Sequence, residues 1–514
     1  MADNLASFKV FCQGGLNTSR DVLSQGETQP GSAISLINYE PSVTGGYRKI
    51  NGFSNDYGTV TGKANTPVLG VCVANGINDG ILACREQTVG NDYLLYWDTA
   101  TEAWVNVTTS GSPTMTGVTK VRFTKYNWGS SKVLLTDAVN PAATYDGTTY
   151  TQITHADAPS APRLSHVFKN HMFLAGDPSE DTNLYFSAPY DETSFAPADG
   201  AGVINVGFPV VAIKSFRDVL YIFGSNNIRK LVGDNISNFV LQEVTDDLGC
   251  LATDSVIEIG GDLLFLSQDG LRPVSGTDKI GDVNLETVSK DIQSIFTDIV
   301  FDIDLETLNA VVIRQKTQFR YFFGAADSQG VIGGFRQTPN GLQFEYSQML
   351  GITATCADSG YIGQNEFVIH GTQDGKVHRQ ERGNDFDGED IFSVFQTPFF
   401  HMQDPEQRKV FYTVATYLRA EGDNEIVMSA LYDYEDIDTL SPTNFTLTTT
   451  GAAAYYNEAL YNSTAIFDGN PAPVKRTNIS GSGKSASFKF VTNDSNASHS
   501  IQGLVITFGV GDRL

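Results

Sequence analysis

The chain has 514 residues, of which 41% are hydrophobic, and it carries 59 acidic against 34 basic side chains. The resulting net charge of −25 argues against a protein whose task is to grip DNA, because an acidic surface repels the phosphate backbone. It leaves open a role in which DNA passes without adhering. The 49 glycines, 32 phenylalanines and 21 tyrosines favour turns and sheets over helices, so we expect an all-β fold.

The cysteines and the apolar runs restrict the class of protein further. None of the cysteines has a partner at CxxC spacing, so neither a zinc site nor a disulfide framework is expected. No apolar run reaches 18 residues, and the first residues lack the basic and apolar regions of a secretory signal. We therefore expect no membrane-spanning segment, no cofactor, and folding in a cytoplasm. The five cysteines are Cys12, Cys72, Cys84, Cys250 and Cys356.

The first 55 residues form an entry segment. Two short strands, Phe8–Phe11 and Ala33–Asn38, are predicted on either side of a polar loop that contains Pro30-Gly31. The pair Gly45-Gly46 then turns the chain into Tyr47–Lys49. We expect residues 1–55 to add strands to a domain formed by the C-terminal part of the chain.

Residues 56–383 repeat a pattern of short apolar strands separated by turns. The pattern is clearest between Phe208 and Ser275, where runs of four to six apolar or β-branched residues alternate with turns such as Gly260–Asp262 and Asp269-Gly270. Four short strands in about 40 residues are typical of a β-propeller blade. We predict a propeller of about six to seven blades, in which the strands Thr353–Gln380 form either a seventh blade or the closing strands.

One stretch of the propeller region departs from the strand pattern. Between Asn284 and Asp302, apolar residues recur at helical spacing and predict one short amphipathic helix against a blade edge. After Gly383 the strands become longer and alternate regularly, for example over Lys409–Ala420. Residues 384–514 are therefore predicted to form an antiparallel β-sandwich-like platform domain.

Motifs with possible chemistry are weak in this sequence. The acidic turn Asn384–Asp390 lacks the flanking helices and the final glutamate of an EF-hand, so a solvated turn is favoured over a cation site. The stretch Gly481–Ser485 ends like a phosphate-binding loop, but the alternating residues after it predict a strand rather than a helix. The seven histidines show no metal spacing, and no carboxylate pair stands out for glycoside chemistry. No catalytic residue is assigned.

Ordered motifs carry a family resemblance at three places in the chain. Two motifs lie in the middle of the chain: a Gly-Cys pair that contains Gly249, and Q-D-G-L-R, which contains Asp269-Gly270. Two more follow around the end of the propeller region: D-G-K-V-x-R-Q-E-x-G-x-x-F-D-G, which ends with Asp387-Gly388, and D-P-x-x-R-K, which ends with Arg408-Lys409. The first three blades carry no such motif. The N-terminal residues are Gly14 and Gly15 of GGLN, Tyr39 of N-Y-x-P, and Gly45, Gly46, Arg48, Lys49 and Gly52 of G-G-Y-R-K-x-x-G-F. Taken from the N-terminus to the C-terminus, the order of these motifs resembles that in the tail stabilisation, or nozzle, proteins of short-tailed bacteriophages.

The resemblance implies a structural virion protein, not an enzyme. Such a protein is assembled in the host bacterial cytoplasm, and several copies, usually six, close a ring below the portal and adaptor proteins. The ring forms the distal part of the DNA-ejection conduit and offers docking surfaces for fibres or spikes, and genomic DNA passes it without tight binding. Two alternatives remain: a propeller that binds or degrades glycans on a host cell surface, and a cytoplasmic scaffold propeller.

Overall fold

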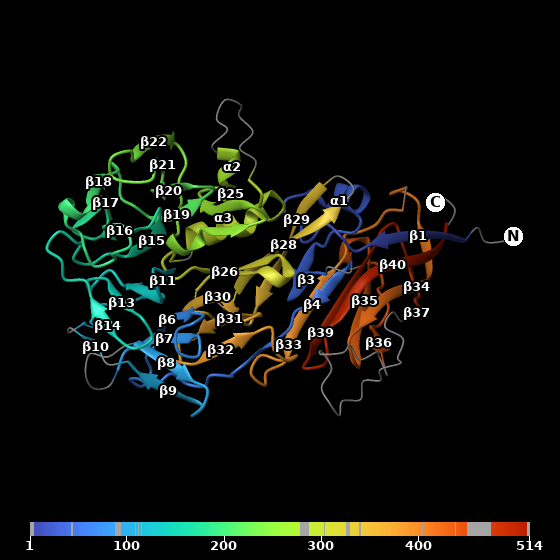
Figure 1. The fold of residues 1–514 in the computed structure, drawn as a ribbon. Helices are drawn as coiled ribbons and strands as arrows, with labels where there is room; N and C mark the ends of the chain where they lie inside the picture. The colour runs from blue at the N-terminus through green and yellow to red at the C-terminus, as the bar shows by residue number, and fades with distance from the viewer. Residues whose placement is uncertain are drawn as a thin grey trace.

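The computed structural model describes residues 5–42, 45–87, 94–107, 109–110, 113–114, 116–277, 287–302, 304–324, 329–338, 341–402, 404–436, 438–449 and 474–510. The predicted all-β class is confirmed. Small blade sheets form a propeller at one end of the molecule, and two larger sheets lie at the other end (Figure 1). In these parts of the chain, no helix is long and apolar enough to cross a membrane.

Six separate sheets form blades of the propeller, as the repeated strand–turn pattern predicts. Each begins with the strand nearest the axis and continues outward by antiparallel pairing. The short strand β10 (Thr109–Ser110) joins the second blade in parallel with its last strand. The blades are β6 (Val68–Val73) to β9 (Ala103–Asn106) with β7 (Ile81–Arg85) and β8 (Leu94–Asp98); β11 (Arg122–Asn127), β12 (Ser131–Thr136), β13 (Ala143–Tyr145) and β14 (Tyr150–Gln152); β15 (Leu164–Phe168), β16 (His171–Asp177), β17 (Glu180–Phe186) and β18 (Gly202–Asn205); β19 (Ala212–Phe216), β20 (Val219–Phe223), β21 (Ile228–Val232) and β22 (Val240–Thr245); β23 (Ile257–Ile259), β24 (Asp262–Ser267) and β25 (Gly270–Pro273); and β30 (Cys356–Ile362), β31 (Asn365–Gly371) and β32 (Val377–Gln380) with β5 (Phe53–Ser54).

A nine-stranded sheet connects the propeller to the other end of the molecule. Its first strand, β26 (Asn309–Ile313), contacts β23 on one side and β30 on the other, so it takes a place in the ring of blades. The number of blades therefore agrees with the predicted six to seven: six separate blades, and one position occupied by part of this larger sheet. The order along the sheet is β26, β27 (Gln318–Phe322), β28 (Gln329–Thr338), β29 (Gly341–Leu350), β2 (Ser35–Ile37), β33 (Ile391–Gln396), β39 (Ala486–Asp494), β35 (Asn424–Tyr432) and β36 (Phe445–Thr449).

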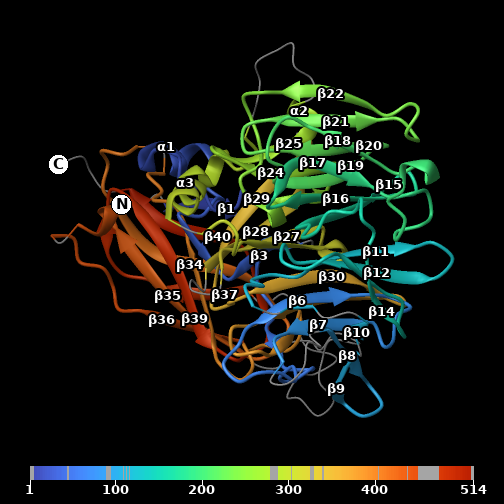
Figure 2. The ribbon, with the colours of Figure 1, turned by 90° about the vertical axis from the view of Figure 1, so that its left-hand side faces the viewer.

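A seven-stranded sheet packs against the far half of the nine-stranded sheet, as in a β-sandwich (Figure 2). Its central strand, β40 (His499–Val510), pairs with β34 (Lys409–Ala420) and with β1 (Leu5–Phe11). The remaining strands are β3 (Tyr39–Pro41), β4 (Tyr47–Lys49), β37 (Val474–Asn478) and β38 (Ser482–Gly483).

The N-terminal segment contributes strands to three sheets. Strand β1 pairs with β40, β2 pairs with β33 and β29, and β5 pairs with β32 at the outer edge of the last blade. Phe53 of β5 stacks on Phe386, with ring centroids 5.0 Å apart. The N-terminal segment therefore completes both the last blade of the propeller and the sandwich.

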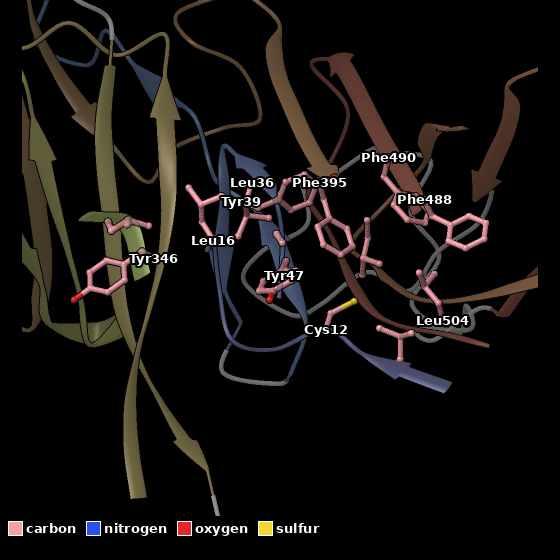
Figure 3. Close-up of a cluster of buried hydrophobic side chains, with 14 of the residues drawn as sticks. Cys12, Leu16, Leu36, Tyr39, Tyr47, Tyr346, Phe395, Phe488, Phe490 and Leu504 are labelled. Carbon is pink, nitrogen blue, oxygen red and sulfur yellow. The ribbon is translucent and has the colours of Figure 1, made fainter. Parts of the chain in front are cut away.

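The main core lies where these sheets meet the N-terminal segment (Figure 3). Tyr39 and Tyr47 are fully buried there, between Tyr346 of β29 and Phe395 of β33. The Tyr47 hydroxyl accepts from the Gly15 amide and donates to the Gly31 carbonyl oxygen, which satisfies its polar atom in the core.

The helices differ in part from the prediction. The predicted helix from residue 284 begins later: a 3₁₀ turn, η3 (Lys290–Ile292), leads into α3 (Gln293–Asp302), while residues 284–286 lie outside the described part of the chain. The loop predicted around residues 12–32 contains α1 (Val22–Thr28), whose first turn is capped by the Asp21 carboxylate. The other short helices are α2 (Val274–Thr277), η1 (Pro197–Asp199), η2 (Thr253–Ser255), η4 (Arg314–Lys316) and η5 (Asp433–Glu435).

Candidate functional site

A group of buried and partly buried charges lies where the N-terminal segment, the propeller and the sandwich meet. We call it the charged junction. It balances three cations against three carboxylates, a composition that satisfies buried charge. Its members are Glu40, Arg48, Lys316, Arg320, Glu381 and Glu421.

Arg48 connects the N-terminal segment to the sandwich. Its Nε and Nη2 atoms donate to the two carboxylate oxygens of Glu421, each at 2.6 Å, and its Nη1 atom donates to Glu40 at 3.1 Å. Burial alone disfavours the charged guanidinium, but the hydrogen bonds and the charges of Glu421 and Glu40 outweigh it and raise the pKa of Arg48. The bidentate arrangement fixes the direction of both side chains.

Arg320 and Lys316 connect the propeller to the same junction. Arg320, on β27, is fully buried, donates to the Glu381 carboxylate and donates to Gln380 at 2.9 Å. Lys316 lies 2.6 Å from Glu40 and 2.5 Å from Glu381. Burial raises the pKa of the Glu381 carboxyl, but Arg320 and Lys316 outweigh that effect and lower it to about 2.

The other N-terminal residues of the resemblance bind partners outside this junction. The Gly14 amide donates to Glu345 at 2.6 Å, and the Tyr39 hydroxyl is 2.9 Å from Nε2 of His499. Lys49 is buried and binds Asp494 at 2.6 Å. The Gly52 amide donates to the carbonyl oxygen of Gly383, which lies beside the acidic turn.

The two glycines of the turn before β4 differ in their surroundings. Gly45 and Gly46 both have positive φ, at +92° and +84°. A Cβ on Gly45 would meet nothing, whereas a Cβ on Gly46 would overlap the carbonyl oxygen of Ile501 on β40. Of these two glycines, Gly46 is therefore the one that approaches β40 closely.

The mid-chain residues of the resemblance lie apart from the junction, in the fourth and fifth blades. Gly249 packs against the backbone of Gly224, at the end of β20. Asp269 binds Arg272 through its carboxylate, and Gly270 begins β25 with φ of +113°. The predicted Asp269-Gly270 turn is therefore shifted by one residue, because Gly270 already pairs with Ser267.

The acidic turn and the Arg-Lys pair have structural partners. Asp385 accepts a hydrogen bond from the Gly388 amide at 2.9 Å, and Asp387 lies 3.4 Å from Lys376. Within the described residues, no group of three histidine, cysteine or acidic side chains could hold a metal ion. Arg408 is exposed and donates to Ser482, while Lys409 is buried and donates to the carbonyl oxygens of Asp404 and Lys484.

The outward side of the seven-stranded sheet, which we call the outer sheet face, is formed by β1, β40, β34 and β37. Register partners place Phe11, Gly503, Tyr417 and Val474 in one row across these strands. Phe11 is 69% exposed, and Tyr417 and Val474 are each 42% exposed. At the other end of the strands, the exposed residues Leu5 and Val410 both pair with Gly509.

The charge of these four strands is opposite to that of the chain. They contain no acidic residue, although the chain has 59. A basic sheet face with apolar rows at both ends suits an acidic protein surface. The basic residues on the outward side of these strands are Lys9, Arg419 and Arg476, whereas Lys409 is buried and Lys475 pairs with the buried Thr416.

Sequence reasoning reached only part of the junction. Arg48 and Glu381 belong to quoted motifs and Glu40 stands one residue after a motif tyrosine, but Lys316, Arg320 and Glu421 lie in unremarkable strands and turns far apart in the sequence. The basic character of the outer sheet face could have been found from the sequence, because the predicted strands Lys409–Ala420 and Ser500–Val510 contain no carboxylate.

No protein-family model matches the chain. No curated protein matches it either. Among solved structures, the chain is similar to an exo-β-1,3-galactanase from Phanerochaete chrysosporium determined with galactose, at 9% identity over 89% of this chain and 100% of that chain, with a TM-score of 0.24. The same enzyme determined with β-1,3-galactotriose gives 9% identity, 89% and 99% coverage, and a TM-score of 0.23. At such TM-scores the likeness carries no argument about function.

Proposed function

We propose that this chain is a structural virion protein: the tail nozzle of a short-tailed bacteriophage. In this proposal several copies, six by analogy with the family it resembles, close a ring below the portal and adaptor. The ring forms the distal part of the DNA-ejection conduit and provides surfaces where fibres or spikes dock. It acts by shape and charge, without a catalytic step.

The observation that carries the proposal is the outer sheet face. It exposes two apolar rows, and the charged side chains of its four strands are all basic in a chain of net charge −25. A second copy offers an acidic surface of the complementary sign, so this face suits contact with a different surface of the next copy. Contacts of that head-to-tail kind close a ring when a whole number of copies completes one full turn.

The charged junction supports the same proposal. Subunits of a conduit must keep a fixed geometry while DNA passes under load. Arg48, Arg320 and Lys316 join the three parts of the chain through ion pairs. Arg320 is fully buried, and breaking a buried pair costs about 3–5 kcal/mol. The propeller and the sandwich are thus held in one orientation.

The proposal is tested by the mass of the purified protein in solution and by negative-stain imaging. We expect rings with a central hole, and we expect Tyr417→Ser and Arg476→Glu to convert them into folded single copies. The matched controls are Val240→Ser, an exposed apolar residue on the outermost strand of a blade, and Lys63→Glu, an exposed lysine of the propeller. A protein that stays a single copy at high concentration, or rings that lose assembly equally in the controls, would contradict the proposal.

A further inference from the structure

The inner strands of the blades enclose a pocket on the propeller axis. It has a volume of about 240 Å³, and β6, β11, β15, β19, β26 and β30 all contribute to its wall. Its size suits a small molecule and excludes a DNA duplex, which is roughly 20 Å across. The pocket is therefore separate from any conduit that a ring of copies would form.

The charged side chains on this wall are mainly basic. Lys120, Arg122 and Lys214 line the pocket together with two carboxylates, Asp254 and Asp358. Both carboxylates are already bound. Asp254 accepts from Lys120 at 2.6 Å and from Arg122 at 2.9 Å, which together lower the pKa of its carboxyl against the effect of burial.

The carboxylate of Asp358 is neutralised by Lys125 of β11. Its Oδ2 atom accepts from Lys125 and from the Val73 amide, both at 2.8 Å. Asp254 is shared by two cations, and the exposed Glu306 lies 3.8 Å from Arg122 and 2.8 Å from Arg163. Lys214 adds a positive charge to the wall that none of these carboxylates binds. An acidic protein thus contains a small basic pocket at its axis.

Lys214 is the cation without a bound partner. Among the described residues, its ammonium group makes no hydrogen bond or ion pair, and the exposed Glu258 on β23 acts on it only through space. Burial, together with the charges of Lys125 and Arg314, lowers the pKa of Lys214 against the opposing charges of Glu258 and Asp358. An anion in the pocket would supply that missing partner.

His166 adds a neutral donor beside this lysine. The Ser215 amide donates to Nε2 of His166 at 2.9 Å, so the hydrogen of the neutral ring is on Nδ1. Burial and the charge of Lys214 lower the pKa of His166 to about 3, so the ring stays neutral at pH 7. Ser165 and Thr124, whose hydroxyl groups are 2.7 Å apart, add polar atoms to the same wall.

We propose that the axial pocket binds a small oxyanion, a carboxylate or a phosphate, with Lys214 as its main cation and Arg122 as the second. The oxyanion is either inorganic phosphate or the carboxylate of an acidic sugar, since both present the same oxygen pattern to an ammonium and a guanidinium group. This site lies within one copy of the chain and does not depend on the ring proposed above.

The test is isothermal titration of the full-length protein with sodium phosphate and, separately, with sodium glucuronate, at constant ionic strength with chloride as background. Saturable binding of either anion at one site per chain is expected, and the anion that binds identifies the source. Lys214→Met should weaken binding about 10-fold or more, because a hydrogen bond to a charged group is lost. Lys214→Arg should retain it.

The matched control is Lys63→Met, which removes the same charge from the propeller surface. It should leave binding unchanged, and the thermal midpoints of all three variants should confirm that they are folded. The proposal is overturned if neither anion binds saturably to the wild-type protein. It is equally overturned if Lys214→Met binds as the wild type does, or if Lys63→Met weakens binding to the same extent.

Discussion

The guanidinium group of Arg320, with no exposed surface, is bound to the carboxylate of Glu381, across the boundary between β27 and the turn after β32. A buried charge that loses its partner remains desolvated, whereas an exposed one is taken up by water. The loss of stability when one member of the Arg320–Glu381 pair is removed therefore tests whether the charged junction stabilises the fold.

Removing one member of this pair should destabilise the protein strongly. Glu381→Gln should cost about 3–5 kcal/mol, since Arg320 and Lys316 both lose a carboxylate. The equivalent change in an exposed pair, Glu86→Gln beside Lys63, should cost less than about 1 kcal/mol. Thermal or urea unfolding measures both, and equal effects in the two variants would contradict the assigned role of the junction.

The two glycines before β4 provide a matched pair of substitutions. Gly45→Ala should cost about 1 kcal/mol, because its positive φ strains an alanine and nothing else changes. Gly46→Ala should cost clearly more, since its Cβ would also overlap the Ile501 carbonyl oxygen and push β4 away from β40. The difference between the two unfolding midpoints is the relevant measurement. Equal losses would mean that the turn does not approach β40 closely.

The buried histidines predict a loss of stability in mild acid. Burial and the charge of Lys49 lower the pKa of His499 to about 3, compared with about 6.5 for an unfolded histidine. Above pH 6.5 the folded and unfolded states bind the same number of protons at this ring. Below pH 6.5 only the unfolded state takes up the proton, so stability falls progressively down to about pH 3, at most about 1.4 kcal/mol per pH unit.

His166 should add to this fall, because its pKa is lowered in the same direction. The thermal midpoint should therefore decrease from pH 7 to pH 4.5. In His499→Gln the decrease should be shallower, since one titrating ring is absent, even if the midpoint at pH 7 is lower. An unchanged slope would show that His499 does not titrate as its surroundings indicate.

The proposed conduit makes a prediction about DNA. With a net charge of −25 per chain, the assembled protein should show no measurable binding to duplex DNA at low salt, where a DNA-gripping protein binds most tightly. Electrophoretic mobility shift at about 20 mM salt measures this, where the screening length exceeds 20 Å. Tight binding that salt abolishes would argue against free passage of DNA.

The blades could be predicted because their information is local. Runs such as Val219–Phe223, ended by Asn226 and Asn227, determine both the strand and the turn from neighbouring residues. Strand lengths in the sandwich, such as that of β34, follow from alternation alone. Helix α1 was missed because its seven residues depend on the Asp21 cap rather than on an apolar stripe.

The candidate site could be predicted only in part because its partners meet in space. Tyr39, Arg48 and Lys49 stood out through ordered motifs, but nothing near Arg320 in the sequence indicates that it will face Glu381 and Glu40. The axial pocket has the same origin: Lys120, His166 and Lys214 come from three different blades. Such groups form only when the blades of the propeller close into a ring, and no local sequence pattern predicts which side chains then meet.

The pairing of β1 with β40, from Leu5 opposite Gly509 to Phe11 opposite Gly503, has a consequence for biosynthesis. A ribosome makes Leu5–Phe11 long before Gly503–Gly509, so β1 cannot pair with β40 until the residues between them have been synthesised. Contacts between residues so distant in sequence form slowly and expose strand edges in the meantime. The outer sheet face is therefore completed only after β40 has been made, so a nascent chain that stops before β40 cannot enter an assembly through that surface.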